Sequence, residues 1–579
     1  MQSLSGRLST ALSCLLCMAA VWRLESHPAA AQSPQLPKAA VATQSAPPLQ
    51  PASVTSPRSP AADPRPLIAA PGTELCTAKR GESIPAIARH YLGKTSYLTS
   101  SQLGEAIRTV NHKSDSSNIL KANETIVIPG ILPAPIREKS VQAPKDFEVR
   151  AVYLTGVMAA SDKGLRIIHQ WRAVGGNAVV FDIKDSDGSV AIPFDHPLLG
   201  EHKVYLHDVP KFVHFLHSLN MHAIARIAIF RDERLVVAHP ELAVQSRKNH
   251  TAWRENGKLV WTDPSNPKVQ EYDIALARHV AQLGVDEVQF DYVRFPAEGD
   301  QKDAAFVFQK DQPDPSAGND PQDSCAQSET AHKTTGSSSD SKNDPPASTR
   351  TNEAKPTGGP HAPQARRTQR QAACSLKPRG PQRSDVIAGF LKKAYSEIHP
   401  TGVLLSLDVF GVMAWQRPID LSHTGQDIVQ MARYCDVLSP MIYPSHFFGM
   451  DNIPHPGDEP AHFIGESMDR FMLITKGSGV VIRPWLQAFH WRTKTYSPEY
   501  IKIQVETART KGGVGFLFWN AANDYSKPYI AMPEMKAANY KGGGTKDNPK
   551  YFRGDELPAA TMQASIPKSS NPVTGSEAR

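Results

Sequence analysis

Cysteine is scarce in this chain of 579 residues, and its spacing excludes a common class of metal module. Beyond the N-terminal segment only four of the six cysteines remain, namely Cys76, Cys325, Cys374 and Cys435. None of these four has CxxC spacing, so a cysteine-based zinc module is not expected. Cys325 and Cys374 are candidates for a disulfide in an oxidising compartment.

Other motifs are missing as well. No GxSxG sequence is present, which argues against a serine hydrolase with a nucleophile elbow. We find no nucleic-acid-binding motif, and the formal net charge of +7 is modest for this length. His214 and His217 could ligate a metal, and Asp185-Ser-Asp187-Gly188 resembles the start of a calcium loop, but a solvated helix face and a turn are the better interpretations. No nucleic acid, metal or cofactor is therefore expected.

No apolar run has the length of a comfortable membrane span. Arg7 precedes an apolar stretch from Leu8 to Trp22, and Ala29-Ala30-Ala31 is a plausible cleavage site. Residues 1–31 therefore resemble a secretory signal peptide. An uncleaved anchor and lipid attachment at Cys14 or Cys17 are the alternatives. We expect a secreted, periplasmic or cell-envelope protein of bacterial type, with no stable membrane span after signal cleavage.

Proline, by contrast, is abundant, and its 48 residues gather in segments without apolar periodicity. Such segments cannot bury enough apolar surface to fold. We expect disorder in a linker at 32–73, in a low-complexity insert at 298–382 and in a tail at 541–579. Because the insert leaves the fourth predicted barrel strand, it could cover the site or form a passive insertion, and we favour the passive insertion.

Residues 74–130 form a separate small unit. Its matching features are the turn Gly81-Glu82-Ser83-Ile84, a helical stretch ending at Asn111, and a closing strand Ile126-Val127-Ile128-Pro129. The unit resembles a LysM module, with the order strand, helix, helix, strand. The resemblance implies binding to glycans that contain N-acetylglucosamine, such as peptidoglycan or chitin. A purely structural βααβ cap is the alternative.

From residue 149 to 536 the chain alternates strand-like and helix-like segments eight times. This pattern predicts an α/β fold, a (β/α)8 TIM barrel. A doubly wound open sheet is the alternative, but no glycine-rich phosphate turn follows the first strand. The strands are expected at 150–155, 177–184, 222–230, 286–293, 403–409, 436–443, 480–487 and 514–520.

The stretch VDEVQFDYVRFP, residues 285–296, is the most informative of these strands. Its alternation places Glu287, Gln289 and Asp291 on one face, which is unusual for a strand of a parallel barrel unless that face points inward. Asp291 then lies at the carboxyl end of strand four, where barrel enzymes hold their chemistry. The same alternation directs Asp408, at the end of strand five, inward.

Asp291 and Asp408 therefore form a candidate catalytic pair. Adjacent strands lie about 4.8 Å apart, which suits the spacing of about 5–5.5 Å between the carboxyls of a retaining glycosidase. The other inward or strand-end residues are candidates for substrate binding, because aromatic faces suit sugar rings and polar groups suit hydroxyls. They are Asp182, Lys184, Arg226, Tyr292, Arg294, Tyr443, Trp485, Gln487, Trp519 and Asn520.

A family resemblance supports this prediction. DIKDSDGSV, ARIAIF, VDEVQFDYVRFP, LDVFG, DVLSPMIYPSHF and GFLFWNAAND are similar to the motif series of a bacterial glycoside hydrolase family with (β/α)8 barrels. In better-known relatives of the α-amylase type the nucleophile is an Asp ending strand four, which falls on Asp291. Those relatives carry a Glu acid/base after strand five, where this chain has the shorter Asp408.

The sequence thus predicts an exported glycoside hydrolase that acts on a cell-envelope or extracellular polysaccharide, retains anomeric configuration and is targeted by its LysM-like module. The main alternative is a non-catalytic carbohydrate- or peptidoglycan-binding protein with a degenerate barrel. A polysaccharide deacetylase would need an Asp-His-His metal set, which the sequence does not offer.

Overall fold

The computed structural model describes residues 70–114, 118–310 and 380–537. The predicted signal peptide, most of the linker, the tail, and Cys325 and Cys374 lie outside these residues. No helix in the described part of the chain is long and apolar enough to cross a bilayer.

Residues 70–131 fold around a two-stranded antiparallel sheet. Strands β1 (Thr73–Thr77) and β2 (Thr125–Pro129) pair along their full length, and helices α2 (Ile84–Tyr91) and α3 (Ser100–Val110) come between them in sequence. Ser83 accepts a hydrogen bond from Ala86 N at the start of α2, and Thr99 forms a capping box with Gln102 at the start of α3. The order strand, helix, helix, strand is the one expected from the sequence.

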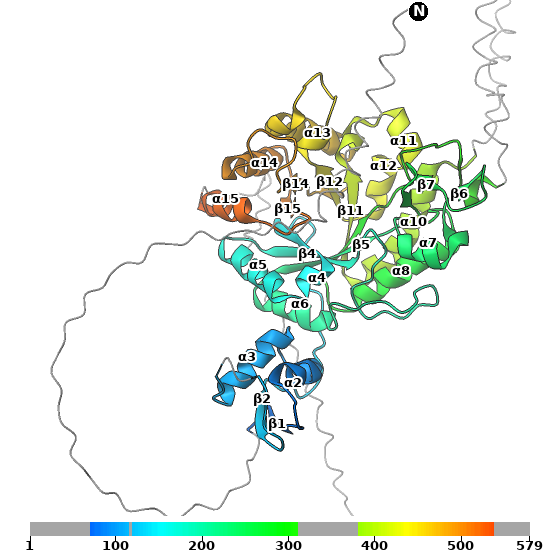
Figure 1. Ribbon diagram of the computed structural model, residues 1–579. Helices are drawn as coiled ribbons and strands as arrows, with labels where there is room; N and C mark the ends of the chain where they lie inside the picture. Colours follow the sequence, from blue (N-terminus) through cyan, green and yellow to red (C-terminus); the bar gives the residue numbers. More distant parts are fainter. Residues whose placement is uncertain (1–69, 115–117, 311–379, 538–579) are drawn as a thin grey trace, which may run out of the picture. The chain divides into compact units, whose positions relative to one another are not determined.

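Eight parallel strand positions close into a barrel, which confirms the predicted fold class (Figure 1). Strand β15 pairs with β3, and β11 pairs with both β9 and β12, so the sheet has no open edge. The strands are β3 (Val149–Leu154), β4 (Ala178–Lys184), β5 (His222–Ala228), β9 (Glu287–Asp291), β11 (Leu404–Phe410), β12 (Val437–Ile442), β14 (Trp485–Gln487) and β15 (Gly515–Trp519).

The seventh strand position is divided in two. A short strand β13 (Val481–Ile482) precedes β14, and Arg483 and Pro484 separate them. Proline cannot donate a ladder hydrogen bond, which explains the break. Both pieces still pair with β12, so the barrel remains closed.

Helices surround the strands (Figure 1). Their apolar faces pack on the barrel, while loops at the strand ends carry shorter elements. The main helices are α5 (Asp162–Ala173), α6 (Val209–Ser218), α8 (Pro267–Ala281), α10 (Arg383–Ile398), α13 (Pro460–Ile474), α14 (Pro498–Thr510) and α15 (Ser526–Ala537), and the short ones are α4 (Gly156–Ala159), α7 (Glu233–Ala238), α11 (Pro418–Thr424) and α12 (Ile428–Met431).

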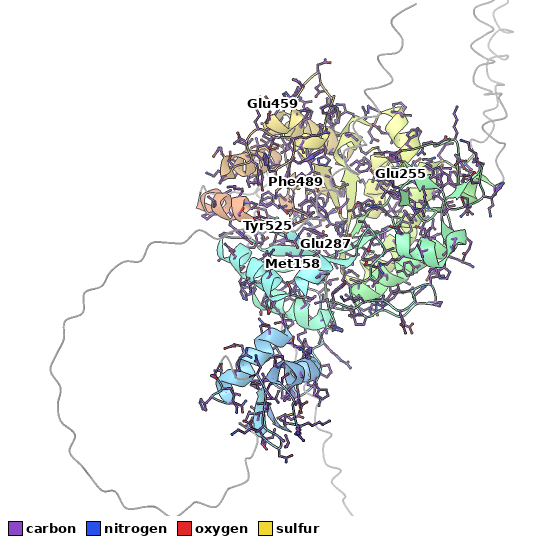
Figure 2. All side chains as sticks on the ribbon, in the orientation of Figure 1. Met158, Glu255, Glu287, Glu459, Phe489 and Tyr525 are labelled. Atoms are coloured by element: carbon purple, nitrogen blue, oxygen red, sulfur yellow. The ribbon has the colours of Figure 1, made fainter. Side chains whose placement is uncertain are left out.

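Side chains fill the barrel interior, with Glu287 among them (Figure 2). Near the amino ends of the strands, Glu287 Oε2 accepts hydrogen bonds from Arg483 (2.7 Å) and from His222 (3.2 Å). Burial would raise the pKa of Glu287, but the charge of Arg483 and the hydrogen bond from His222 outweigh it and lower the pKa to about 2. Phe147, fully buried, packs in the core cluster below them.

His214 and His217, both on α6, contact carboxylates, and the burial of His217 shows that the expected solvated helix face was wrong for this residue. Their Nδ1 atoms lie 2.7 Å and 3.1 Å from the two carboxylate oxygens of Glu138, and His217 Nε2 lies 3.0 Å from Asp286 Oδ2. Glu138 belongs to the segment that enters the barrel. In the described part of the chain no group of three or more His, Cys, Asp or Glu could hold a metal ion.

The start of the predicted insert is folded, which corrects its boundary. Residues 304–305 form strand β10, which pairs with β6 (Gln245–Ser246), and Phe306 is buried. Phe306 packs edge-to-face on Phe295, with ring centroids 4.9 Å apart, and Arg383 lies over its ring. Residues 307–382 form a second unit, of which the structure describes only 307–310 and 380–382.

Candidate active site

A cavity of about 780 Å³ opens at the carboxyl ends of the barrel strands. Both predicted catalytic carboxylates line it, and so do seven of the ten candidate substrate-binding residues. These seven are Arg226, Tyr292, Arg294, Tyr443, Trp485, Trp519 and Asn520. The position agrees with the usual site of barrel enzymes.

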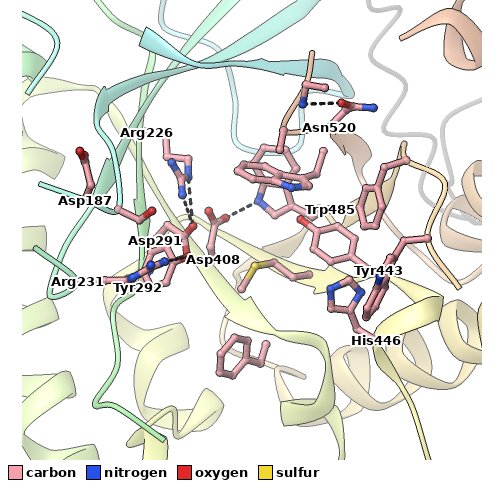
Figure 3. Close-up of a pocket in the computed structure, with 18 of the residues that line it drawn as sticks. Asp187, Arg226, Arg231, Asp291, Tyr292, Asp408, Tyr443, His446, Trp485 and Asn520 are labelled. Carbon is pink, nitrogen blue, oxygen red and sulfur yellow. Dashed lines mark hydrogen bonds and ion pairs between the residues drawn. The ribbon is translucent and has the colours of Figure 1, made fainter. Parts of the chain in front are cut away.

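Asp291 and Asp408 lie side by side at this face (Figure 3). Strands β9 and β11 pair in parallel with Phe290 opposite Leu407, and each aspartate is the next residue along its strand. The two residues are therefore at the same height on neighbouring strands, whose backbones lie about 4.8 Å apart. Alternation directs both side chains inward, as the sequence predicted.

Arg226 holds Asp291 on β9 and Asp182 on β4 at the same time. Its Nη2 donates to Asp291 Oδ2 at 2.6 Å, and its Nη1 donates to Asp182 Oδ1 at 2.5 Å. The guanidinium is 2% exposed, and the charges of Asp182 and Asp291 outweigh this burial and raise the pKa of Arg226 above its usual range. Asp291 Oδ1 accepts a further bond from Tyr292 N at 2.6 Å, which fixes the carboxylate in the cavity wall.

Asp408 has a different environment from its neighbour. It is 1% exposed, and burial together with the nearby charge of Asp291 raises its pKa well above the usual range. Trp485 Nε1 donates a hydrogen bond to Asp408 Oδ1 at 2.7 Å. The pair thus joins a carboxylate held by a cation to a carboxyl that favours its protonated form.

Asp182 does not line the cavity. It lies beneath Arg226 and accepts a hydrogen bond from the Tyr153 hydroxyl. Burial raises the pKa of Asp182 to about 7 even though the charge of Arg226 opposes the shift. Its contacts make it a support for Arg226.

Lys184 does not point into the barrel, so the predicted orientation is wrong. A register shift between Asp182 and Lys184 interrupts the alternation of β4. Lys184 is fully buried instead in ion pairs with Asp232 (2.9 Å) and Asp273 (2.8 Å), the second of which lies on α8. It supports the barrel wall rather than the cavity.

Gln487 is fully buried and does not line the cavity either. Its Oε1 accepts from Ser445 Oγ at 2.9 Å, and its Nε2 donates to the carbonyl of Phe489 at 3.0 Å. These bonds tie together the loops that follow β12 and β14. Asn520 has a similar role, because it donates to Ala488 O (2.6 Å) and Asp524 O (2.9 Å), but it also lines the cavity.

Aromatic rings form part of the cavity wall. Trp519 stacks on Tyr153 with centroids 4.1 Å apart, and Trp485 meets Trp519 edge-to-face at 5.8 Å. The Arg226 guanidinium lies 5.3 Å from the Trp519 ring centre. Rings arranged in this way offer flat apolar faces beside hydrogen-bonding groups, which suits a sugar ring.

Sequence reasoning missed the lining residues that come from loops. The long connection between β5 and β9 supplies Arg231, Glu255 and Trp261, and the loops after β12 and β14 supply His446 and Trp491. Burial and the charge of Arg492 lower the pKa of His446 to about 3. The length of the β5–β9 connection was the available signal, since long loops at this face commonly carry function.

Comparison with known proteins now identifies the family. Residues 151–525, more than half of the chain, match the family described as "putative glycosyl hydrolase domain". The chain belongs to this family. The barrel is therefore a glycoside hydrolase domain, and the family match agrees with the resemblance found in the sequence.

Solved structures of other proteins are also similar to the chain. A hypothetical protein from Ruminiclostridium thermocellum ATCC 27405 is 35% identical, with coverage of 28% of this chain and 84% of that one and a TM-score of 0.25. The PgaB (BpsB) glycoside hydrolase domain from Bordetella bronchiseptica is 12% identical, with coverage of 66% and 98% and a TM-score of 0.43. The spore cortex-lytic enzyme SleL of Bacillus megaterium QM B1551 is 10% identical, with coverage of 79% and 85% and a TM-score of 0.33. Comparison with curated proteins gave no match.

Proposed function

We propose that the protein is an exported glycoside hydrolase that cleaves a cell-envelope or extracellular polysaccharide with retention of configuration. Asp291 is the nucleophile and Asp408 the acid/base. The observation that carries this proposal is the contrast between the two carboxyls: Arg226 accompanies Asp291, whereas burial beside Asp291 favours the protonated form of Asp408. Retaining glycosidases need one ionised and one protonated carboxyl at the start of the reaction.

The reaction proceeds in two steps. Asp291 attacks the anomeric carbon while Asp408 donates its proton to the departing glycosidic oxygen, and a glycosyl ester forms on Asp291. Asp408, now ionised, then removes a proton from a water molecule, and that water displaces Asp291 from the sugar. The second step returns the proton to Asp408 and leaves the product with its original anomeric configuration.

Their places on neighbouring strands favour retention over inversion. An inverting enzyme separates its carboxyls by about 6.5–9.5 Å to admit a water molecule, whereas a retaining enzyme holds them about 5–5.5 Å apart. Asp291 and Asp408 follow directly after the paired residues Phe290 and Leu407, so their backbones are as close as two strands of a sheet can bring them.

Sugar binding falls to the rings and polar groups around the pair. Trp485 and Trp519 offer aromatic faces next to the carboxyls, and Tyr443 brings a buried hydroxyl to the cavity wall. Tyr292, Arg294 and Asn520 complete the proposed binding residues. Arg226 positions Asp291 through its ion pair, and Asp182 positions Arg226.

The LysM-like module, residues 74–130, is proposed to hold the enzyme on peptidoglycan or chitin-type glycans. Its support is the βααβ fold and the matched Asn111, which accepts from Val127 N and donates to Val127 O, both at 2.8 Å. A purified fragment of residues 70–131 should sediment with insoluble peptidoglycan or chitin. Failure to sediment with either polymer would remove the targeting part of the proposal.

A glycan screen with product analysis tests the proposed activity. We expect the full chain to release reducing ends from at least one amino-sugar-containing polysaccharide, and NMR of the first products should show the anomer of the substrate. Asp408→Asn, which keeps shape and removes the acid, serves as the matched control. Glycan binding by the wild type without turnover would instead favour the non-catalytic carbohydrate-binding protein.

A further inference from the structure

Arg294 is a buried cation on the cavity wall with most of its hydrogen-bonding capacity unused. It is 8% exposed, and among the described residues its side chain makes one hydrogen bond, from Nη1 to the carbonyl of Phe295 at 3.0 Å. No carboxylate in the described part of the chain lies within ion-pair distance of it. A guanidinium carries five N–H donors, so a single bond to a carbonyl leaves the group far from satisfied.

Aromatic rings hold this guanidinium in place. Its central carbon lies 4.4 Å from the ring centre of Trp261 and 4.5 Å from that of Phe410, and all three side chains line the cavity. Both rings pack against the guanidinium and hold it in place, and a guanidinium packed on aromatic rings can still donate hydrogen bonds from its N–H edge. That edge is the part of arginine that binds a carboxylate through two parallel bonds.

A second arginine lies close by. Arg231 donates to the Tyr292 hydroxyl at 3.0 Å, and both guanidinium groups lie near the Tyr292 ring, at 5.2 Å for Arg231 and 5.8 Å for Arg294. Arg231 and Tyr292 are on the Asp291 side of the cavity (Figure 3). Tyr292 has a φ of 54°, a left-handed conformation that is unusual for a tyrosine.

Glu255 and Glu298 are the acids whose charges act on Arg294, and within the described residues neither forms an ion pair with it. Glu255 uses one oxygen to accept from Ala297 N (3.0 Å) and Glu298 N (2.9 Å) and the other to accept from Trp261 Nε1 (2.8 Å). Glu298 is the second acid, and burial together with the charge of Glu255 raises its pKa to about 7. A large part of the Glu298 population is therefore uncharged near neutrality.

We propose that Arg294 and Arg231 form a carboxylate-binding subsite next to Asp291, so that the substrate is a glycan bearing a carboxylate on a sugar close to the cleaved bond. This inference rests on the proposed function for its cleaved bond but names a substrate class that the function alone does not. A uronic acid and a sugar with a lactyl ether both supply the carboxylate. Arg294 is then a specificity-determining residue, and Arg231 adds charge at longer range.

Three tetrasaccharides that all contain N-acetylglucosamine separate these possibilities. The chitin tetrasaccharide is uncharged, the peptide-free peptidoglycan tetrasaccharide carries lactyl carboxylates, and the hyaluronan tetrasaccharide carries uronate carboxylates. Each is titrated into full-length Asp408→Asn protein, which preserves the cavity and prevents turnover. The titration is repeated with Arg294→Gln added. A control with Lys248→Gln removes the same charge from an exposed surface pair outside the cavity.

We expect Arg294→Gln to weaken binding of at least one carboxylated tetrasaccharide tenfold or more, because a hydrogen bond to a charged group contributes about 1.5–3 kcal/mol. Chitin tetrasaccharide binding should change less than twofold, and Lys248→Gln should change neither. All variants contain the LysM-like module, so any binding through it contributes equally to each and drops out of the ratio of their affinities. The carboxylated sugar that responds identifies lactyl or uronate as the source.

Equal effects of Arg294→Gln on charged and uncharged tetrasaccharides, or no effect on any, would overturn the proposal. Two further measurements guard against a misfolded variant. First, Arg294→Lys keeps the charge and should keep part of the preference for the carboxylated tetrasaccharide. Second, in the protein with Arg294 unchanged, affinity for the responding tetrasaccharide should fall as salt is raised from 50 to 500 mM, whereas affinity for the chitin tetrasaccharide should not. Because binding is measured without turnover, a protein that prefers the carboxylated sugar yet hydrolyses nothing would contradict the proposed activity and leave this subsite standing.

Discussion

Trp485 donates a hydrogen bond from its indole Nε1 to Asp408 Oδ1 at 2.7 Å, across two strands that are not adjacent in the barrel. The bond stabilises the ionised form of Asp408 and so opposes the burial that raises its pKa. The hydrogen bond from Trp485 therefore limits how far burial raises the pKa of the proposed acid/base. Its partner was recognised from the sequence as a sugar-stacking aromatic, and the structure adds this second role.

Replacing Trp485 by Phe should move the alkaline limb of the pH–rate profile upward. Without the indole N–H, the ionised form of Asp408 loses stabilisation, so its pKa rises further and the acid stays protonated to higher pH. The expected shift is about 1 pH unit, since one pKa unit corresponds to about 1.4 kcal/mol and a hydrogen bond to a charge contributes about 1.5–3 kcal/mol. The profile of kcat/KM measures it. A limb that stays in place or moves downward would show that Asp408 does not set it.

Arg226→Met should destabilise the barrel strongly. The change leaves Asp182 and Asp291 buried without their common cation, which typically costs about 3–5 kcal/mol. Adding Asp182→Asn should recover part of the lost stability because a buried carboxyl that has lost its cation is then replaced by a neutral amide. Thermal melts of both variants measure the effect. Arg234→Met, which breaks an exposed pair with Asp187, is the control and should cost less than about 1 kcal/mol. Equal losses of stability for Arg226→Met and Arg234→Met would contradict a stabilising role for the buried Arg226 ion pairs.

His217 should stabilise the protein more in mild acid than in alkali. Burial would lower its pKa, but hydrogen bonds to Asp286 and Glu138 outweigh burial and raise the pKa to about 9. Because the folded pKa is above the unfolded value of about 6.5, this stabilisation is complete below pH 6.5 and disappears as the pH rises through about 9. His214 and His222 face the same carboxylates and belong to the same network.

The difference in Tm between wild type and His217→Gln measures this effect. We expect the difference to be larger at pH 6 than at pH 10, whereas His169→Gln, on the exposed face of α5, should show no such dependence. A His217→Gln difference that is the same at both values would mean that the ring is neutral in the folded protein.

Two deletions within the predicted insert, with different boundaries, should change the Tm by different amounts. Replacing residues 311–379 with a short Gly/Ser linker should change Tm by less than a few degrees, because that sequence has no apolar periodicity and loop closure depends only weakly on length. Replacing 298–382 should lower Tm clearly, because it removes β10 and the buried Phe306. Thermal melts compare the two. A drop of more than about 10 °C for the shorter deletion would mean that the deleted residues pack on the barrel.

Strand-encoded features could be predicted from the sequence. The period-two alternation of buried strands predicts all eight strand positions and the inward direction of Asp291, Asp408 and Trp485. This alternation can be read from the sequence of each strand alone, without knowing which residues lie next to it in the fold. Lys184 was placed wrongly because a single-residue register shift reverses the alternation, and nothing in the local sequence marks that shift. Gln487 was assigned to the right strand, but its partners come from two loops.

Loop-encoded features could not be predicted. Trp261, Arg231 and Glu298 come from irregular segments, and loops have no period that fixes which side chain faces a cavity. Arg294 was a candidate from its place after strand four, but its aromatic neighbours Trp261 and Phe410 are brought to it only by folding. The predicted start of the insert was wrong for the same reason, because a single buried residue such as Phe306 produces no apolar periodicity in the sequence.

The most direct test of the proposed mechanism is to trap the glycosyl-enzyme. Asp408→Ala protein is mixed with a glycoside of the sugar found in the screen, carrying a leaving group that needs no protonation, and the intact mass is then followed. We predict that the glycosyl ester forms quickly and persists, because no base remains to activate water, and that proteolysis places it on Asp291. An adduct on any other residue, or turnover to an inverted product with no adduct at all, would contradict the assignment of Asp291 as the nucleophile.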